Sequence, residues 1–146
     1  MIDEKKMEDK IQEFISAIIQ KTIQKEIFWE TISELSTTES GFPDIVDQTA
    51  RQFFMNEFRQ ILHKNSFFFY HQGGVVALIR IDNTSGKDGS HSCEFALAMQ
   101  IRPNIPPCAF DTPELQESLS SLYTAILNYL SRDLKMPDDL YTFMQF

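Results

Sequence analysis

The sequence contains few of the residues that hold a fold together covalently, since only Cys93 and Cys108 are cysteines among 146 residues. Small secreted domains that depend on disulfides carry many more cysteines, so we expect a reducing compartment and no disulfide framework. No apolar run approaches the ~20 residues of a membrane-spanning helix. Residues 1–25 also lack the continuous apolar stretch of a signal peptide. We therefore expect a cytoplasmic protein without membrane contact.

Clusters of basic residues are absent as well, and the formal net charge is −8. The charge is −4 over residues 1–40, +1 over residues 41–81 and −5 over residues 82–146. Nucleic acids are bound mainly through Lys and Arg, so the sequence predicts no nucleic-acid partner. An acidic surface suits a basic protein partner, although solubility alone is the simpler explanation of the charge.

Short catalytic motifs are missing too: the sequence has no G-x-S-x-G, H-E-x-x-H or G-x-G-x-x-G. Residues 85–88 resemble part of a phosphate-binding loop, but they lack its earlier glycine and the Ser or Thr after the lysine. These absences favour a protein that is not an enzyme, but they leave the question open.

Metal or nucleophile chemistry has few candidates. Structural zinc needs four N or S ligands with paired spacing, and no such pair accompanies His63, His71 and His91. We therefore predict no metal and no cofactor. A nucleophilic Cys93 would need a base facing it, but His91 precedes it by two residues on the same expected strand. A small buried hydrophobe is the more common role of a free cysteine, and the same holds for Cys108.

What the sequence does contain is a strong β-hairpin signal over residues 66–81, SFFFYHQGGVVALIRI. Two apolar, β-prone runs flank Gly73 and Gly74, and glycine tolerates the positive φ of tight hairpin turns. Strands are expected near residues 66–71 and 75–82. Residues 93–102 alternate between large apolar and small or polar side chains, which indicates a third strand after a polar loop at 82–92.

Three helices are expected around these strands. Residues 4–25 carry an apolar stripe, broadened by Ile19 and Ile23, whose main members are Ile11, Phe14, Ile15, Ile18 and Thr22. A second helix is expected from Pro43 to Lys64, with one broad face formed by Val46, Ala50, Phe53, Phe54, Phe58, Ile61 and Leu62.

The third helix begins at Thr112-Pro113-Glu114, a capping hydroxyl followed by a proline and an acid, and ends near residues 132–135. Its packing face should consist of Leu115, Leu119, Leu122, Ile126 and Tyr129 or Leu130. Pro137 can open a last short helix, with Leu140, Phe143 and Met144 facing inward.

The connecting segments are less regular. Residues 27–32 read IFWETI, and their composition favours a short strand over a continued first helix. Residues 36–43 read as a loop. Residues 103–113 hold four prolines and are expected to be irregular.

Together these elements predict an α+β fold in a single domain, residues 1–146, with an antiparallel sheet of three to four strands packed against N-terminal and C-terminal helices. Alternation sends two rings of Phe67-Phe68-Phe69-Tyr70 to each side of the sheet. Since buried rings contribute about 1.5–3 kcal/mol each, both sides should be covered. One arrangement places the first helix on one side and the later two on the other. In the alternative the helices cover one face, and the other face is partly open or is covered by the first helix or by a second subunit.

The sequence does not identify a function, and two hypotheses stay open. The first is a non-catalytic, cytoplasmic protein-interaction domain with an acidic surface, of an accessory, immunity or antitoxin type, which binds a protein partner or associates with itself. The alternative is a domain that binds or transforms a small molecule in a pocket between sheet and helices. Its candidate ligand-binding residues are Tyr70, His71 and Cys93.

Overall fold

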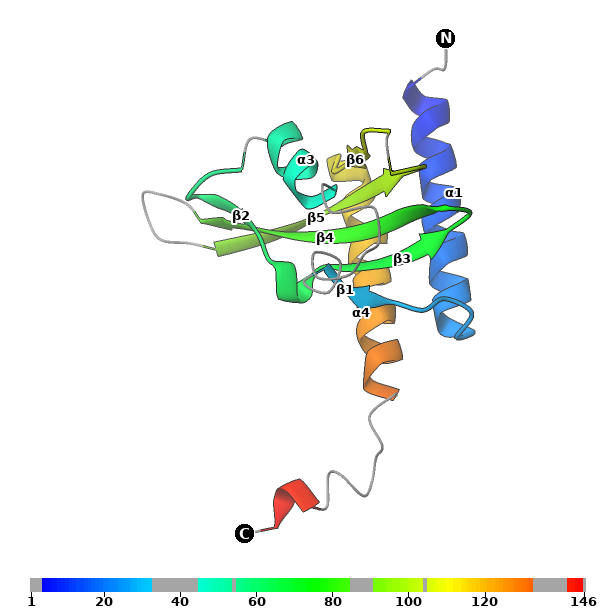
Figure 1. Ribbon diagram of the computed structural model, residues 1–146, viewed down its shortest axis with the longest axis vertical. Coiled ribbons are helices and arrows are strands. Elements are labelled where there is room, and N and C mark those ends of the chain that lie inside the picture. The colour runs from blue at the N-terminus through cyan, green and yellow to red at the C-terminus, as the bar shows by residue number, and fades with distance from the viewer. Residues whose placement is uncertain are drawn as a thin grey trace.

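Strand β4 (Gly74–Thr84) is the centre of the fold, because other strands pair with it along both of its edges. A computed structural model (Figure 1) describes residues 4–32, 45–53, 55–84, 91–103, 105–132 and 142–145. Across these residues the fold is α+β, with one antiparallel sheet and a long helix near each end of the chain. The predicted fold class is confirmed, and the sheet is larger than predicted.

The six described strands form a sheet of order β1-β3-β4-β5-β6, and β2 lies against β4 beyond the end of β3. In chain order the other strands are β1 (Glu30–Thr31), β2 (Arg59–Ile61), β3 (Phe67–His71), β5 (His91–Gln100) and β6 (Cys108–Phe110). The strand predicted within residues 27–32 is therefore present, although only two of its residues pair with β3.

One edge of β4 is covered by two strands in succession. β3 pairs with β4 over Gly74–Leu78 and β2 pairs with it over Ile81–Asn83. Between them the 3-10 turn η1 (His63–Asn65) leaves the sheet, and Ser66 completes the edge. The Ser66 Oγ accepts a hydrogen bond from the Arg80 backbone N–H at 2.9 Å and donates to the Leu62 carbonyl at 2.8 Å.

The turn between β3 and β4 lies one residue earlier than the glycine pair suggests. Gln72 and Gly73 occupy it with φ of 49° and 81°, and two successive positive φ values are the requirement of a type I′ hairpin turn. Gly74 is the first residue of β4 and pairs with His71. It has a different reason to be glycine, because a Cβ there would collide with the Gln100 carbonyl oxygen and lie 2.6 Å from that of Ile101.

Helices α1 (Glu4–Ile23) and α4 (Gln116–Arg132) lie side by side on one face of the sheet (Figure 1). The Gln12 amide donates to the Glu114 carbonyl at 3.0 Å and accepts from the Ser118 hydroxyl at 2.6 Å, so α4 begins beside the middle of α1. The two helices run in the same direction, because the end of α1 lies beside the later turns of α4 (Figure 1). The arrangement that separated the first and last helices onto opposite faces is therefore wrong.

This helix-covered face holds the larger hydrophobic core. The predicted stripes are largely confirmed, with Thr22 buried beside them; Ile23, by contrast, is 54% exposed, because the helix ends there. The buried members are Ile11, Ile15, Ile18, Ile27, Trp29, Phe67, Phe69, Val76, Leu78, Phe95, Leu97, Leu115, Leu119, Leu122 and Ile126.

The opposite face of the sheet is buried as well. Its core consists of smaller side chains from the central strands together with Phe68 from β3, and the short helix α3 (Ile45–Gln52) contributes Ile45. The strand residues of this core are Phe68, Val75, Ala77, Ile79, Ile81, Ala96, Ala98 and Ala109. Phe67 and Phe69 thus face α1 and α4 while Phe68 faces the other way, as the alternation predicted.

The second helix is much shorter than predicted, because the chain folds back at Asn56 instead of continuing to Lys64. The Asn56 side chain accepts a hydrogen bond from the Phe58 N–H at 2.8 Å, and Asn56 and Arg59 form a β-bridge through their backbones. An Asn side chain that bonds its neighbouring backbone competes with the helix in this way. Phe58, placed on the packing face by the periodicity, is 49% exposed.

Residues 103–113 are not wholly irregular, since β6 pairs with β5 from Leu97 to Met99. The prolines flank this strand and leave its three residues free to pair. Beyond Phe110, where β6 ends, the Gln116 side chain bonds the edge of β5 in place of a neighbouring strand. Its amide accepts from the Phe95 N–H and donates to the Phe95 carbonyl, both at 2.8 Å.

Smaller expectations near the loops and the C-terminus also differ from the structure. β4 and β5 extend into the predicted 82–92 loop, and β5 ends at Gln100, so Ile101 is 67% exposed. Thr112 does not cap the last helix through its side chain, and a 3-10 turn η2 (Pro113–Leu115) precedes α4. The predicted loop at 36–43 and Leu140 lie outside the described residues.

Residues 142–144 form one helical turn, but Phe143 is 85% exposed and Met144 is 54% exposed, so neither faces inward. No helix in the described part of the chain is both long and apolar enough to cross a bilayer.

We expect alanine to destabilise the protein by different amounts at the two glycines of the hairpin. Gly74→Ala forces Cβ into the backbone of β5, and we expect it to lower the free energy of unfolding by about 1–3 kcal/mol or more. Gly73→Ala meets no atom within 4 Å and should cost only the left-handed backbone penalty of roughly 1–2 kcal/mol. Urea unfolding followed by Trp29 fluorescence measures both.

Asn tolerates positive φ, so Gly73→Asn should recover most of the loss at that position. If alanine at Gly73 and at Gly74 lowered the free energy of unfolding by the same small amount, the close approach of the β5 backbone to Gly74 would be contradicted.

Candidate functional site

The structure brings two of the three candidate residues together and separates the third. Tyr70 and His71 are neighbours at the hairpin end of β3, opposite Val75 and Gly74 of β4. Cys93 pairs with Asp82, seven residues farther along β4 than Val75. At about 3.3 Å per residue this places Cys93 roughly 23 Å away, at the other end of the sheet.

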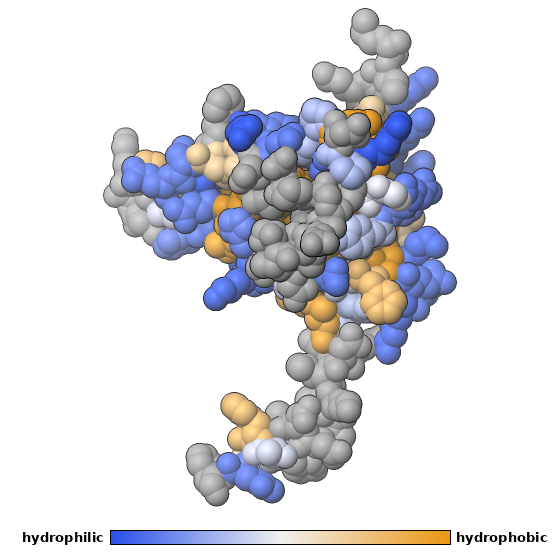
Figure 2. All heavy atoms as spheres, in the orientation of Figure 1, coloured by the Kyte–Doolittle hydropathy of each residue, from blue (hydrophilic) through white to orange (hydrophobic). Residues whose placement is uncertain are grey.

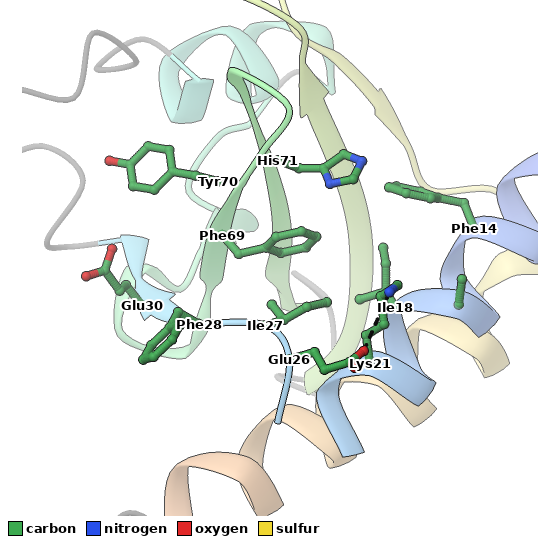
Figure 3. Close-up of a pocket in the computed structure, with 11 residues that line it drawn as sticks. Phe14, Ile18, Lys21, Glu26, Ile27, Phe28, Glu30, Phe69, Tyr70 and His71 are labelled. Atoms are coloured by element: carbon green, nitrogen blue, oxygen red, sulfur yellow. Dashed lines mark ion pairs between the residues drawn. The ribbon is translucent and has the colours of Figure 1, made fainter. Parts of the chain in front are cut away.

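Tyr70 and His71 border a groove of about 580 Å³ between α1 and the outer edge of β3. We call it the α1–β3 groove (Figure 3). The view shows α1 on one side, β3 on the other and residues 26–30 across the end. Its lining residues are Phe14, Ala17, Ile18, Lys21, Glu26, Ile27, Phe28, Glu30, Phe69, Tyr70 and His71.

The groove has a buried apolar floor and an exposed rim. Ile18, Ile27 and Phe69 of the floor belong to the main core and are at most 8% exposed. On the rim, Phe28 is 83% exposed, although it is one of the largest apolar side chains in the protein. Figure 2 shows hydrophobic atoms in orange reaching the surface beside α1. The groove is thus an open apolar channel with an exposed aromatic ring on its rim.

His71 forms the end wall of the groove through aromatic contacts. Its ring centroid lies 5.8 Å from that of Phe14 and 6.0 Å from that of Phe69. Tyr70 points to the other side of β3, away from this wall (Figure 3), and its ring packs edge-on against Phe68 at 5.5 Å. His71 therefore shapes the channel, whereas Tyr70 contributes only to its outer border.

The way in which α1 ends creates the groove. Lys25 adopts a left-handed conformation with φ of 61°, and the Glu26 N–H donates to the Lys21 carbonyl at 2.8 Å. This closes the helix without a glycine and turns the chain back across the sheet edge. An ion pair between Lys21 and Glu26 at 3.5 Å spans the turn, but both side chains are more than half exposed and it contributes little stability.

A buried hydrogen-bond relay anchors the returning segment to α1. The Trp29 indole N–H donates to the Thr22 hydroxyl at 2.9 Å, and that hydroxyl donates to the Ile18 carbonyl at 2.8 Å. Trp29 also packs edge-on against Phe69 with centroids 4.7 Å apart. With Trp29 held inward, alternation along the extended segment directs Phe28 outward.

A smaller hollow of about 150 Å³ lies beside the groove at the hairpin end, and Phe14 and His71 border both cavities. Met99, Gln100 and the exposed Ile101 border it. The Gln100 amide donates to the carbonyls of Pro103 and Ile105 at 3.1 and 2.9 Å, while its buried Oε1 has no partner among the described residues. This amide fixes the chain as it leaves β5.

Cys93 lies in a different setting, exposed beside Arg80. The Arg80 guanidinium donates to the Cys93 sulfur at 3.1 Å and to the Tyr123 hydroxyl at 2.8 Å, and stacks over the Tyr123 ring. Burial opposes the charged form of Arg80, but its hydrogen bonds and charge interactions with Tyr123 and Cys93 together outweigh burial and raise the pKa of Arg80 above its ordinary value. His91 contacts Asp82 and Thr84 rather than Cys93. The arrangement braces α4 against the sheet.

Arg59 organises the other polar cluster of the described residues. Its guanidinium bonds Glu94 at 2.6 Å, Asp111 at 3.0 Å and the Phe53 carbonyl at 2.8 Å. It thereby joins β2, β5, the end of β6 and the end of α3. Four of its five N–H groups bond protein acceptors, so the cluster holds these elements of the fold together.

Two further observations complete the description of the site. Within the described ranges no three His, Cys, Asp or Glu side chains are grouped so that they could hold a metal ion. Comparison with protein-family models, with curated proteins and with solved structures finds no match for this chain. The geometry of the molecule is therefore the sole basis for a functional argument.

Sequence reasoning found His71 but missed most of the groove. Phe14 and Ile18 appeared only as members of a packing stripe, and Phe28 only as a β-prone residue. The available signal was the alternation Ile27-Phe28-Trp29, in which one large side chain must face away from the other two. That pattern marks an exposed aromatic as soon as the segment is recognised as extended.

The anchoring relay predicts a specific loss on Thr22→Val. Valine keeps the shape of threonine but leaves the buried Trp29 N–H without its acceptor, so we expect the free energy of unfolding to fall by about 1–3 kcal/mol. Thr124→Val is the matched control, because its hydroxyl makes the same helix back-bond at 3.2 Å on an exposed position. Urea unfolding should show little change there, and equal losses would refute the anchor.

Proposed function

We propose that this protein is a non-catalytic protein-interaction domain whose docking surface is the α1–β3 groove. The observation that carries the proposal is the 83% exposure of Phe28 at the lip of a channel whose floor belongs to the hydrophobic core. Large exposed aromatic side chains beside apolar hollows are the usual anchors of protein interfaces. The groove combines an exposed aromatic side chain, Phe28, with an apolar hollow beside it.

The shape of the groove favours a peptide segment over a compact ligand. Its rim residues Lys21, Glu26, Phe28 and Glu30 are exposed, so an occupant is enclosed from below and along the sides only. The channel lies between a helix and a strand, the geometry in which an amphipathic segment lays its apolar side chains into a groove. Among its polar residues, Lys21 pairs with Glu26, and the His71 ring contacts those of Phe14 and Phe69.

The partner should present two or three bulky apolar side chains, with charge as a secondary factor. Of 21 acidic residues, 13 lie in the described ranges, against 11 of the 13 basic residues, so the described part carries only −2 of the net −8. The rim itself carries both signs. Support for a basic partner therefore comes from acidic residues elsewhere in the chain. The cytoplasm suits this role, because Cys93 and Cys108 are both free and exposed.

Selection of displayed peptides on the immobilised protein tests the groove directly. Peptides that bind the native chain should carry clustered bulky apolar residues and should lose at least tenfold in affinity on Phe28→Ser, since central aromatic anchors contribute about 2 kcal/mol or more. Phe58→Ser is the matched control, because Phe58 is also exposed but lies at the β2 turn. Peptides that distinguish neither variant would refute the proposal.

A small apolar ligand is the second candidate, favoured by a volume of about 580 Å³, within the range of ligand sites. Ala17→Phe should fill the channel from an exposed helix position, whereas Ser16→Phe points away from it. A ligand found by thermal shift should stabilise the native chain and Ser16→Phe, with no shift for Ala17→Phe. A shift retained in Ala17→Phe would place the ligand outside the groove.

A further inference from the structure

The last described residues include a helical turn whose apolar side chains are exposed. Residues 142–144 are helical, with Phe143 85% and Met144 54% exposed. Figure 2 shows this turn as hydrophobic atoms at the surface near the C-terminus. Isolated apolar side chains on a surface are common, but a short terminal turn gains little from forming unless something packs against it.

The sequence of this terminal segment has the pattern of a groove-binding helix. Leu140, Phe143 and Met144 follow the i, i+3, i+4 spacing that places side chains on one helical face. The acidic pair Asp138 and Asp139 comes directly before them. Lys21 borders the groove together with Glu26 and Glu30, and Lys25 borders the neighbouring cleft, so charge is a secondary factor and the apolar face of the segment is what fits the channel.

The terminal segment also leaves the fold close to the groove. The last turns of α4 lie beside the end of α1, because Asn128 and Tyr129 border the same small cleft as Ile23 and Lys25. The chain at Lys25 leads directly into Glu26 and Phe28 of the groove. Nine residues, 133–141, join α4 to the exposed turn, and an extended segment of that length spans about 30 Å.

We infer that the α1–β3 groove receives the C-terminal segment of a second copy of this chain, with the exchange made reciprocally. Among the described residues of the single chain, none fills the groove, and Phe143 and Met144 are exposed. The groove of one copy could therefore bury the apolar turn of the other. A twofold arrangement satisfies both at once, and the first insertion raises the effective concentration for the second. The inference rests on the proposed docking role of the groove and adds that a foreign peptide must displace this segment.

Sedimentation velocity over a concentration series tests the exchange with three variants. The native chain should approach twice the mass of the monomer, as should Phe58→Ser. The tail variant Phe143→Ser/Met144→Ser and the groove variant Phe28→Ser should each remain monomeric at concentrations where the native chain is dimeric. Circular dichroism and urea unfolding establish that these surface variants are folded.

Mixing the two monomeric variants tests whether an intact groove and an intact tail on different copies restore the dimer. The tail variant keeps an intact groove and the groove variant keeps an intact tail, so an equimolar mixture should form a heterodimer held by one exchange. A synthetic peptide of residues 133–146 should bind the tail variant and lose at least tenfold in affinity for a tail variant that also carries Ala17→Phe.

A native chain that stays monomeric, or a mixture that shows no heterodimer, would overturn the inference. If the native chain is monomeric and the peptide binds only the tail variant, the segment occupies the groove of its own chain instead. If the masses are unchanged by all variants but selected peptides still require Phe28, the proposed docking function stands and the exchange fails.

Discussion

The burial of β4 on both faces and both edges is the constraint on which the rest of the structure depends. Its side chains alternate between a core covered by α1 and α4 and a second core that includes Ile45 of α3. β3 and β2 close one edge and β5 closes the other. A strand enclosed in this way fixes the register of its neighbours, because a slip of one residue would exchange the two cores.

The groove follows from how this enclosed sheet is completed at its outer edge. β1 pairs with only Phe67 and Phe68, so α1 and the segment after it must cover the remaining part of β3. The relay from Trp29 through Thr22 to Ile18 pulls that segment onto the core and turns Phe28 outward. The exposed ring and the buried floor are thus two consequences of one anchoring contact.

Sequence patterns predicted the helices and strands whose side chains pack over long, regular faces. The stripes of α1 and α4 and the alternation of Phe67 to Phe69 emerged because burial follows the 3.6- and 2-residue periods. The long second helix was wrong, since the Asn56 side chain bonds the backbone at Phe58, an interaction that hydrophobic periodicity ignores. β6 was missed because prolines flank it on both sides, and the proline content of residues 103–113 predicted irregular structure throughout.

The site was less predictable than the fold. Tyr70 and His71 lie at the groove because a hairpin end brings them there. Cys93 is distant, because β5 pairs antiparallel with β4 and therefore begins at the end of β4 opposite the β3–β4 turn. The groove depends on a left-handed Lys25 and on one tertiary hydrogen bond. Neither has a sequence signature of its own, because Lys is not a residue that favours positive φ.

Residue-resolved covalent footprinting of the Phe143→Ser/Met144→Ser variant, whose groove is expected to be open, measures the central claim most directly when it is done with and without a saturating selected peptide. Bound peptide should suppress labelling of Phe28 and of the adjoining rim at Lys21 and Glu30, while Phe58 and Leu127 stay as reactive as in the free protein. Protection at Phe58 or Leu127 with Phe28 still fully labelled would contradict the assignment of the α1–β3 groove as the docking surface.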